Sequence, residues 1–123
     1  MQEDAPKKIL VVDDEPDDRT LWRKILSKKY IVTEACDGGE ALEMARNDNP
    51  ALILMDIMMP KVDGYSACCM IKRDTNTAEI PVVMLTGLED ELSVRRAEEI
   101  GASGYITKPS HPQELLDKIG QFL

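Results

Sequence analysis

The feature that most constrains the fold is a short, mainly apolar run that recurs along the chain and each time ends at a chemically reactive side chain. The runs and the residues that follow them are 9–12 before Asp13 and Asp14, 52–55 before Asp56, 82–85 before Thr86, and 104–107 before Lys108. Short apolar runs bounded by turn signals are typical of buried β-strands. If these strands are parallel, their carboxyl ends share one edge of a sheet, and the reactive side chains converge on one pocket.

Segments with helical spacing lie between these runs. Apolar residues recur there at intervals of three and four, and the residues that define the five predicted helices are Leu21, Trp22, Ile25 and Leu26; Ala41, Leu42 and Ala45; Tyr65, Cys68 and Ile71; Leu88, Leu92, Ala97 and Ile100; and Leu115, Leu116, Ile119, Phe122 and Leu123. Residues 30–34 add a further strand, so strand and helix alternate five times. This alternation predicts an α/β domain in which helices cover both faces of a parallel sheet.

The composition of each strand predicts its position in the sheet. A central strand is buried on both faces and must be apolar throughout, whereas an edge strand can carry polar residues. The runs at 9–12, 52–55 and 82–85 qualify as central, while 30–34 and 104–107 are mixed and suit the two edges. These positions fit the order 2-1-3-4-5 of a flavodoxin-like, doubly wound, five-stranded sheet, and we expect that order partly by analogy with the known fold. Its switch point would lie between the first and third strands.

Size and charge exclude several classes of protein. The 123 residues match a single domain, and no apolar run approaches the ~20 residues of a membrane span. The first residues lack the basic and then apolar order of a secretory signal, and the three cysteines have no zinc-type spacing, so we expect a reducing cytoplasm. The net charge of −8 disfavours direct binding to nucleic acid or anionic lipid. A protein partner is the more plausible expectation.

The predicted pocket has the chemistry of a phosphoryl-transfer site. Like charges at ~4 Å repel by about 1 to 4 kcal/mol, depending on the dielectric, so Asp13, Asp14 and Asp56 need a cation. Mg²⁺ suits a few carboxylates combined with phosphate oxygens. Lys108 and the hydroxyl of Thr86 add groups that could hold a phosphoryl group, and Asp56 is the expected nucleophile.

Five motifs in order carry a resemblance to a known family. They are residues 11–16 (Val-Val-Asp-Asp-Glu-Pro), 54–60 (Leu-Met-Asp-Ile-Met-Met-Pro) with Asp63-Gly64, 81–86 (Pro-Val-Val-Met-Leu-Thr), 101–102 (Gly-Ala) and 105–109 (Tyr-Ile-Thr-Lys-Pro). Together they resemble the response-regulator receiver domain of two-component signalling, of the kind found in chemotaxis receivers. The resemblance covers residues 8–123, with residues 1–7 expected as a flexible lead-in.

The resemblance implies a function and a role for each motif residue. A phosphohistidine on a sensor histidine kinase or a histidine phosphotransfer protein would donate a phosphoryl group to Asp56, with Mg²⁺ as cofactor. Asp14, Asp56 and the backbone carbonyl of Met58 would bind the metal directly, and Asp13 would act mainly through water. The domain would thus be a signalling receiver that promotes its own phosphorylation and dephosphorylation, rather than a separate enzyme.

The resemblance also implies a switch. Lys108 and Thr86 would pair with the phosphoryl oxygens, and Tyr105 would then rotate from outside to inside. The surface formed by the fourth helix, fifth strand and fifth helix would change, and it could serve a partner or a phosphorylation-dependent dimer. Candidate contact residues on it are Arg95, Arg96, Tyr105, Glu114 and Lys118.

Some residues depart from the usual family pattern. Gly87 replaces the common alanine or serine, and glycine loosens a loop. Ser110 stands where a large apolar residue is common. Met58 and Leu88 offer no group to orient an attacking water, so we expect slow loss of the phosphoryl group.

Several alternatives remain open at this stage. Asp13 and Asp14 could simply cap the first helix, Thr86 could be an ordinary strand-end threonine, Tyr105 a static packed aromatic, and Lys108 a solvated surface residue. Cys68 is expected as a small buried helix residue, and His111 as an exposed residue rather than a phosphoryl donor.

Two rival functions also remain: an aspartate-nucleophile phosphohydrolase, and a receiver that binds partners without phosphorylation. A flavin or nucleotide site is disfavoured by the acidic, glycine-free first loop. The cognate kinase, the output target, the oligomeric state and whether further domains exist stay undetermined.

Overall fold

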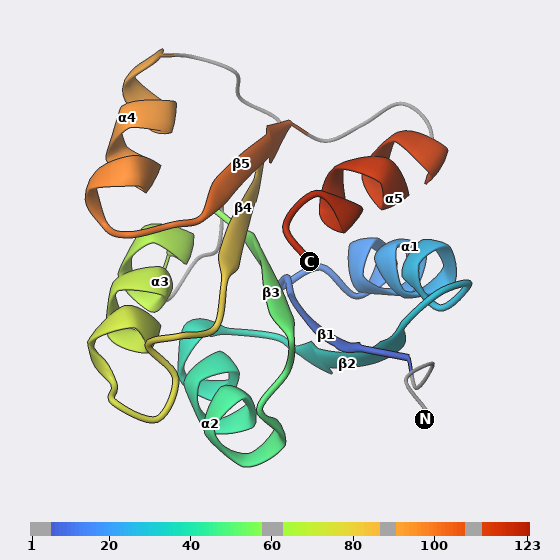
Figure 1. Ribbon diagram of the computed structural model, residues 1–123, viewed down its shortest axis with the longest axis horizontal. Coiled ribbons are helices and arrows are strands. Elements are labelled where there is room, and N and C mark those ends of the chain that lie inside the picture. The colour runs from blue at the N-terminus through green and yellow to red at the C-terminus, as the bar shows by residue number, and fades with distance from the viewer. Residues whose placement is uncertain (1–5, 58–62, 87–90, 108–111) are drawn as a thin grey trace.

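The fold is an alternating α/β arrangement (Figure 1). The computed structural model describes residues 6–57, 63–86, 91–107 and 112–123; within these, the side chains of Thr86 and of residues 91–94 are not described. The strands are β1 (Lys8–Val12), β2 (Ile31–Ala35), β3 (Leu52–Asp56), β4 (Val82–Thr86) and β5 (Gly104–Thr107). The helices are α1 (Pro16–Leu26), α2 (Gly38–Asp48), α3 (Gly64–Arg73), α4 (Glu91–Glu99) and α5 (Pro112–Gly120).

The strands form one parallel sheet of order β2-β1-β3-β4-β5. This confirms the predicted order, and the two mixed strands, β2 and β5, are the edges. The described side chains of β1, β3 and β4 are almost all buried, as expected for strands covered on both faces. The apolar composition of the strands therefore reported their position correctly.

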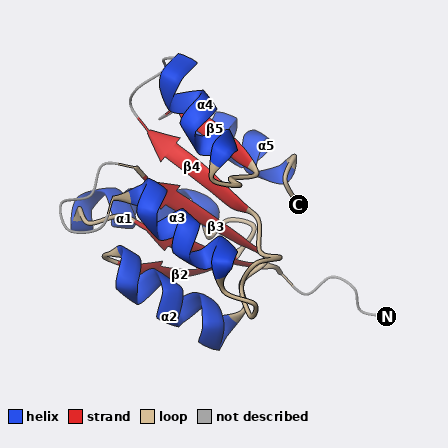
Figure 2. Ribbon diagram, turned by 90° about the vertical axis from the view of Figure 1, so that its left-hand side faces the viewer, coloured by secondary structure: helices blue, strands red, loops and turns tan. Residues whose placement is uncertain are grey.

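Helices cover both faces of the sheet, with α1 and α5 on one side and α2, α3 and α4 on the other (Figure 1 and Figure 2). Because successive residues of a strand point to opposite faces, β1 contributes Ile9 and Val11 to the α1/α5 side and Leu10 and Val12 to the other. Two apolar clusters result, separated by the sheet. No helix in the described part of the chain is long and apolar enough to cross a membrane.

Helix ends follow local sequence signals. Asp37 accepts a hydrogen bond from the Glu40 backbone N–H at 2.8 Å and begins α2, and Asp63 does the same for Ser66 at the start of α3. Asn49 ends α2 in the left-handed conformation.

The second strand was predicted one residue too early at both ends, as 30–34, whereas β2 runs Ile31–Ala35. It begins at Ile31 rather than Tyr30, because the Tyr30 N–H bonds to the Leu26 carbonyl in the turn after α1. The Ile31 N–H is the first of this segment to pair across the sheet, with the Lys7 carbonyl at 2.9 Å.

Candidate functional site

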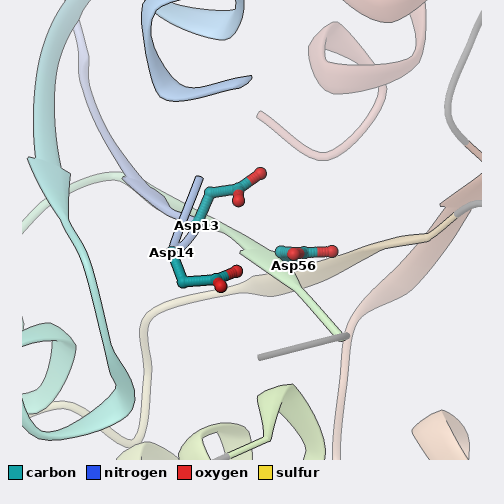
Figure 3. A group of neighbouring side chains, drawn as sticks. All are labelled: Asp13, Asp14 and Asp56. Atoms are coloured by element: carbon teal, nitrogen blue, oxygen red, sulfur yellow. The ribbon is translucent and has the colours of Figure 1, made fainter. Parts of the chain in front are cut away.

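Three carboxylates meet at the carboxyl ends of the first and third strands (Figure 3). Asp13 and Asp14 directly follow β1, and Asp56 is the last residue of β3. Val12 is paired with Met55 in the sheet, so the residues that follow them lie side by side. One oxygen from each carboxylate lies within 4.8 Å of the others. The structure therefore brings together the three acids that the strand pattern predicts at the switch point.

Burial makes this arrangement electrostatically demanding. Asp13 is 1% exposed and Asp56 4% exposed, while Asp14 is half-buried. Removing a carboxylate from water costs free energy unless hydrogen bonds or an opposite charge compensate it. Three hard, anionic oxygen donors at this spacing fit a small divalent cation such as Mg²⁺, which prefers such ligands. The donor set thus suits the metal that the sequence predicts.

Asp13 is held by hydrogen bonds on both of its carboxylate oxygens. The Glu15 backbone N–H donates to Oδ1 at 2.9 Å, and the indole N–H of Trp22 donates to Oδ2 at 3.3 Å. Its backbone is also held, because the carbonyl accepts from Arg19 Nη1 at 2.8 Å and the N–H donates to the Ala35 carbonyl at 3.1 Å. Asp13 therefore has a single well-defined position.

The capping alternative for the first acids is not supported. The N-cap residue of α1 is Glu15, and no side chain makes a capping hydrogen bond there. Pro16 at the first helical position needs no N–H partner, which reduces the need for a cap. Asp13 instead accepts from the N-cap residue itself.

Asp56 is positioned through its backbone. The next residue, Ile57, donates its N–H to the Leu85 carbonyl at 3.2 Å, and the Ile57 carbonyl accepts from the Gly64 N–H at 3.0 Å. A Cβ at position 64 would lie 2.7 Å from the Ile57 Cα and closer still to the Asp56 carbonyl oxygen. Only glycine allows α3 to begin this close to the end of β3.

Two residues of the site were not identified by sequence reasoning as site residues. Trp22 was expected only as a core residue of the first helix, and Gly64 was noted only as part of a motif. The signal for Gly64 was its place after the capping Asp63. No local signal identifies the bond from Trp22, because it depends on how α1 rotates against the sheet.

The predicted switch residues lie on neighbouring strands. Thr86 is the last residue of β4 and is paired with Thr107 of β5, although its side chain lies outside the described residues. Tyr105 is partly buried and packs against the cluster on the α2/α3/α4 side of the sheet. The predictions for Met58, Gly87, Leu88, Lys108, Ser110 and His111 also lie outside the described residues.

The cysteines show no sign of an activated thiol. Cys68 is fully buried in α3, as expected, and burial raises the pKa of its thiol to about 11. Cys36 is exposed next to β2, and its hydrogen bond with Glu40 raises the pKa of its thiol above the usual value. A raised pKa lowers the fraction of reactive thiolate, so neither of these two thiols is activated as a nucleophile.

Comparison with protein families matches residues 9–120 to the response regulator receiver domain. The chain is 42% identical over 118 residues to "Probable transcriptional regulator ycf27" of Cyanophora paradoxa, covering 95% of this chain and 48% of that protein. It is 45% identical over 103 residues to "Response regulator PleD" of Caulobacter vibrioides, covering 83% of this chain and 23% of that protein. The chain therefore spans about half, or less, of the length of these curated relatives.

The fold has a near match among solved structures. The chemotaxis protein CheY4 of Vibrio cholerae superposes with a TM-score of 0.92 at 29% identity, over 97% of this chain and all of that one. At this coverage and TM-score the two chains share the same overall fold.

Proposed function

Since the chain belongs to the response regulator receiver domain family of two-component systems, we propose that it carries its signal as a phosphoryl group on Asp56. The observation that carries this proposal is the cluster of Asp13, Asp14 and Asp56, with oxygens within 4.8 Å of one another and two of the three side chains almost fully buried. Receiver domains act with a sensor kinase and a downstream target. We propose a phosphohistidine donor, on a sensor histidine kinase or a histidine phosphotransfer protein.

In the proposed transfer, a carboxylate oxygen of Asp56 attacks the phosphorus atom. The new O–P bond forms as the N–P bond of the phosphohistidine breaks, and the electron pair of that bond stays on the imidazole nitrogen, which then takes a proton from solvent. Little covalent chemistry is required of the protein, so positioning and charge stabilisation dominate. The backbone bonds around Ile57 and the close approach of Gly64 hold Asp56 for this attack.

Receiver domains generally bind Mg²⁺, and the acidic cluster has the donors to hold it. We propose that Asp14 and Asp56 bind it directly with the Met58 carbonyl, and that Asp13 acts through water. Mg²⁺ in this place offsets the carboxylate charge and that of the incoming phosphoryl oxygens. The two donors already on the Asp13 carboxylate agree with an indirect role for that residue.

The proposed switch uses the neighbouring strands β4 and β5. A phosphoryl group adds about −1.5 to −2 charge, and we propose that Thr86 and Lys108 pair with it only in the closed arrangement. Tyr105, two residues before Thr107 on β5, would turn inward as Thr86 moves. A shift from 1:99 to 99:1 needs about 5.5 kcal/mol of preference for the closed state.

The surface expected to report the switch comprises α4, β5 and α5. Of its candidate contact residues, Arg95 and Arg96 are exposed on α4. Lys118 and Glu114 on α5 form an i, i+4 ion pair at 3.7 Å, which a binding partner could rearrange. We propose this surface as the site of partner binding or of phosphorylation-dependent dimerisation.

The remaining expectations stay part of the proposal. The domain is proposed to occupy residues 8–123, with 1–7 as a lead-in, and to work in the cytoplasm without contacting nucleic acid or membrane itself. The relatives' names describe a transcriptional regulator and a response regulator. By analogy, we propose that this receiver controls either an attached output region or a separate target protein.

The test is labelling with a small phosphoryl donor. Wild-type protein treated with acetyl phosphate and Mg²⁺ should gain the mass of one phosphoryl group, located at Asp56 by peptide mapping. Asp56→Asn is the matched control, because it keeps the side-chain shape and lacks the nucleophile. Equal labelling of the two proteins would reject Asp56 as the acceptor.

The same experiment separates the rival functions. A receiver that binds partners without phosphorylation would take neither acetyl phosphate nor beryllofluoride. A phosphohydrolase would turn over free phosphate esters such as p-nitrophenyl phosphate, but such enzymes typically carry an acid two positions after the nucleophile, where this chain has Met58. We expect labelling of Asp56 without ester turnover.

A further inference from the structure

We propose that Trp22 is a positioning residue for the metal site: its indole N–H orients the Asp13 carboxylate and thereby strengthens Mg²⁺ binding. The inference deepens the proposed function and depends on it. It rests on the hydrogen bond from Trp22 Nε1 to Asp13 Oδ2 at 3.3 Å, which joins a core residue of α1 to the acidic cluster.

The ring of Trp22 packs in the apolar core, whereas its indole N–H makes a polar contact with the acidic cluster. The side chain is 4% exposed and belongs to the apolar cluster on the α1/α5 side of the sheet, together with Val11, Leu26 and Leu54. A buried indole N–H requires an acceptor, and here that acceptor is a carboxylate of the site. Packing of the ring therefore sets the direction of the indole N–H, and the hydrogen bond from this N–H sets the orientation of the Asp13 carboxylate.

The geometry leaves Asp13 with one acceptable orientation. The Glu15 N–H holds Oδ1 at 2.9 Å and the indole holds Oδ2, so a rotation of the carboxylate would break both bonds. Each carboxylate oxygen has two lone pairs, and their directions turn with the carboxylate group. By fixing the carboxylate, Trp22 also fixes the directions of the lone pairs that it does not use itself, which is what a water-mediated metal ligand needs.

The donor also reduces repulsion within the cluster. A hydrogen bond to an ionised group is stronger than one between neutral groups, and it draws negative charge away from the oxygens facing Asp14 and Asp56. Without it, Asp13 remains buried with one fewer donor and greater freedom to rotate. Removing groups that orient metal ligands typically weakens metal affinity 10- to 100-fold, and we expect about tenfold for this longer bond.

The decisive variant is Trp22→3-benzothienylalanine, whose ring has the shape of indole but carries sulfur in place of the N–H. Mg²⁺ affinity, measured by calorimetric titration in the absence of any phosphoryl donor, should fall about tenfold. Trp22→Phe tests the same loss with a natural residue, and its thermal stability without Mg²⁺ records any packing damage separately. Leu26→Met is the matched control, because it changes the same apolar cluster at nearly constant volume and neither side chain has an N–H to donate to Asp13.

A double-mutant cycle separates positioning from packing. In an Asp13→Ala background, replacing Trp22 by 3-benzothienylalanine should change Mg²⁺ affinity by less than about twofold, because the group it positions is gone. A tenfold loss that persists in this background would show a purely structural effect and overturn the proposal. So would an unchanged or tighter affinity in the single variant.

Kinetics give a second readout. Labelling by acetyl phosphate in the benzothienyl variant should require about tenfold more Mg²⁺ for its half-maximal rate, while the rate at saturating Mg²⁺ stays near that of wild type. Two failures are distinguishable. If wild type neither binds Mg²⁺ nor is labelled, the proposed function fails along with this inference; if wild type does both and the variant matches it, only the role of Trp22 fails.

Discussion

The two faces of the sheet differ in the size of the side chains that build them. The α1/α5 face packs large residues from its helices: Trp22, Ile25, Leu26, Leu115, Leu116 and Ile119. On the α2/α3/α4 face, the buried residues that its helices contribute among the described side chains are mainly small: Ala41, Ala45, Ala67, Cys68 and Ala97, beside the larger Tyr65 and Ile71. Leu42 and Met44 of α2 pack there only partly buried. Large side chains interlock and fix two helices, whereas small ones let three helices come close to the strands.

The same difference extends to the acidic cluster. The α1/α5 face reaches it with a long side chain, because Trp22 donates to the carboxylate of Asp13. The opposite face reaches it with backbone, because Gly64 packs against Asp56 and Ile57 without any side chain. Asp13 is therefore held by a hydrogen bond that its carboxylate accepts, and Asp56 by close packing of its main chain.

The largest expected loss of stability comes from truncating a large side chain on the α1/α5 face. Leu115 is fully buried on α5, and Leu115→Ala should lower the free energy of unfolding by about 2–5 kcal/mol, since it opens a cavity in an interlocked cluster. Urea denaturation measures this. Leu21→Ala on α1, where the leucine is 47% exposed, is the control and should change stability by less than about 0.5 kcal/mol. If both variants lost the same free energy of unfolding, the α1/α5 cluster would not depend on its large buried side chains.

The next largest loss of stability is expected from adding a methyl group on the α2/α3/α4 face. Gly64→Ala should destabilise the fold by about 1–3 kcal/mol, because the new methyl group meets main-chain atoms of Asp56 and Ile57, which cannot rotate away. Phosphoryl labelling of Asp56 should slow as its backbone shifts. Gly39→Ala, in the first turn of α2 with its nearest neighbour 3.5 Å from the added Cβ, should leave both stability and labelling unchanged. A neutral Gly64→Ala would mean that the close approach is not required.

A smaller effect is expected at the acid that neither face buries fully. Asp14→Asn should raise stability in Mg²⁺-free buffer by about 1 kcal/mol, because it removes one like charge from the cluster. The stabilisation of wild type by added Mg²⁺, about 2.7 kcal/mol at 100 times the dissociation constant, should be lost in this variant. Thermal denaturation with and without Mg²⁺ measures both, and Glu43→Gln on the exposed face of α2 is the charge-matched control.

A weaker interaction joins α4 to the small-residue face. The guanidinium of Arg96 lies 4.6 Å from the centroid of the Tyr65 ring. At an exposed site such a cation–π contact contributes about 0.5–1 kcal/mol, so Arg96→Ala should cost that much in chemical denaturation. Arg96→Lys, which retains a cation, should recover part of it. If lysine and alanine behave alike, the ring contact does not contribute.

The smallest predicted effect is a loss of stability linked to Cys68, which appears only at alkaline pH. Burial raises the pKa of Cys68 from 9.0 to about 11, so the unfolded chain loses this proton first as the pH rises. The stability linked to Cys68 is fully present below pH 9 and declines as the pH approaches 11. Cys68→Ala should remove this decline from the pH profile of unfolding, while Cys69→Ala, half-buried on the same helix, should keep it. Identical profiles for both variants would reject the assignment.

Much of the fold could be predicted because strand composition reflects burial. The runs before Asp13, Asp56 and Thr86 are apolar throughout since both of their faces are covered, and this placed them at the centre of the sheet. The boundary at Tyr30 was missed because its N–H is taken by the Leu26 carbonyl. That choice between turn and strand depends on where α1 ends in space, which composition does not encode.

For the candidate site, too, the sequence predicts one part and the tertiary structure decides the rest. Sequence alone determined that three acids lie at the carboxyl ends of two adjacent parallel strands, because strand direction and order place those ends together. Only the tertiary structure decided which two of the acids are buried, and how Asp13 and Asp56 are held. The indole of Trp22 and the backbone at Gly64 come from helices on opposite faces of the sheet. Their contacts depend on helix rotation and ångström-scale packing, whereas periodicity along the chain specifies only which side of an element faces the core.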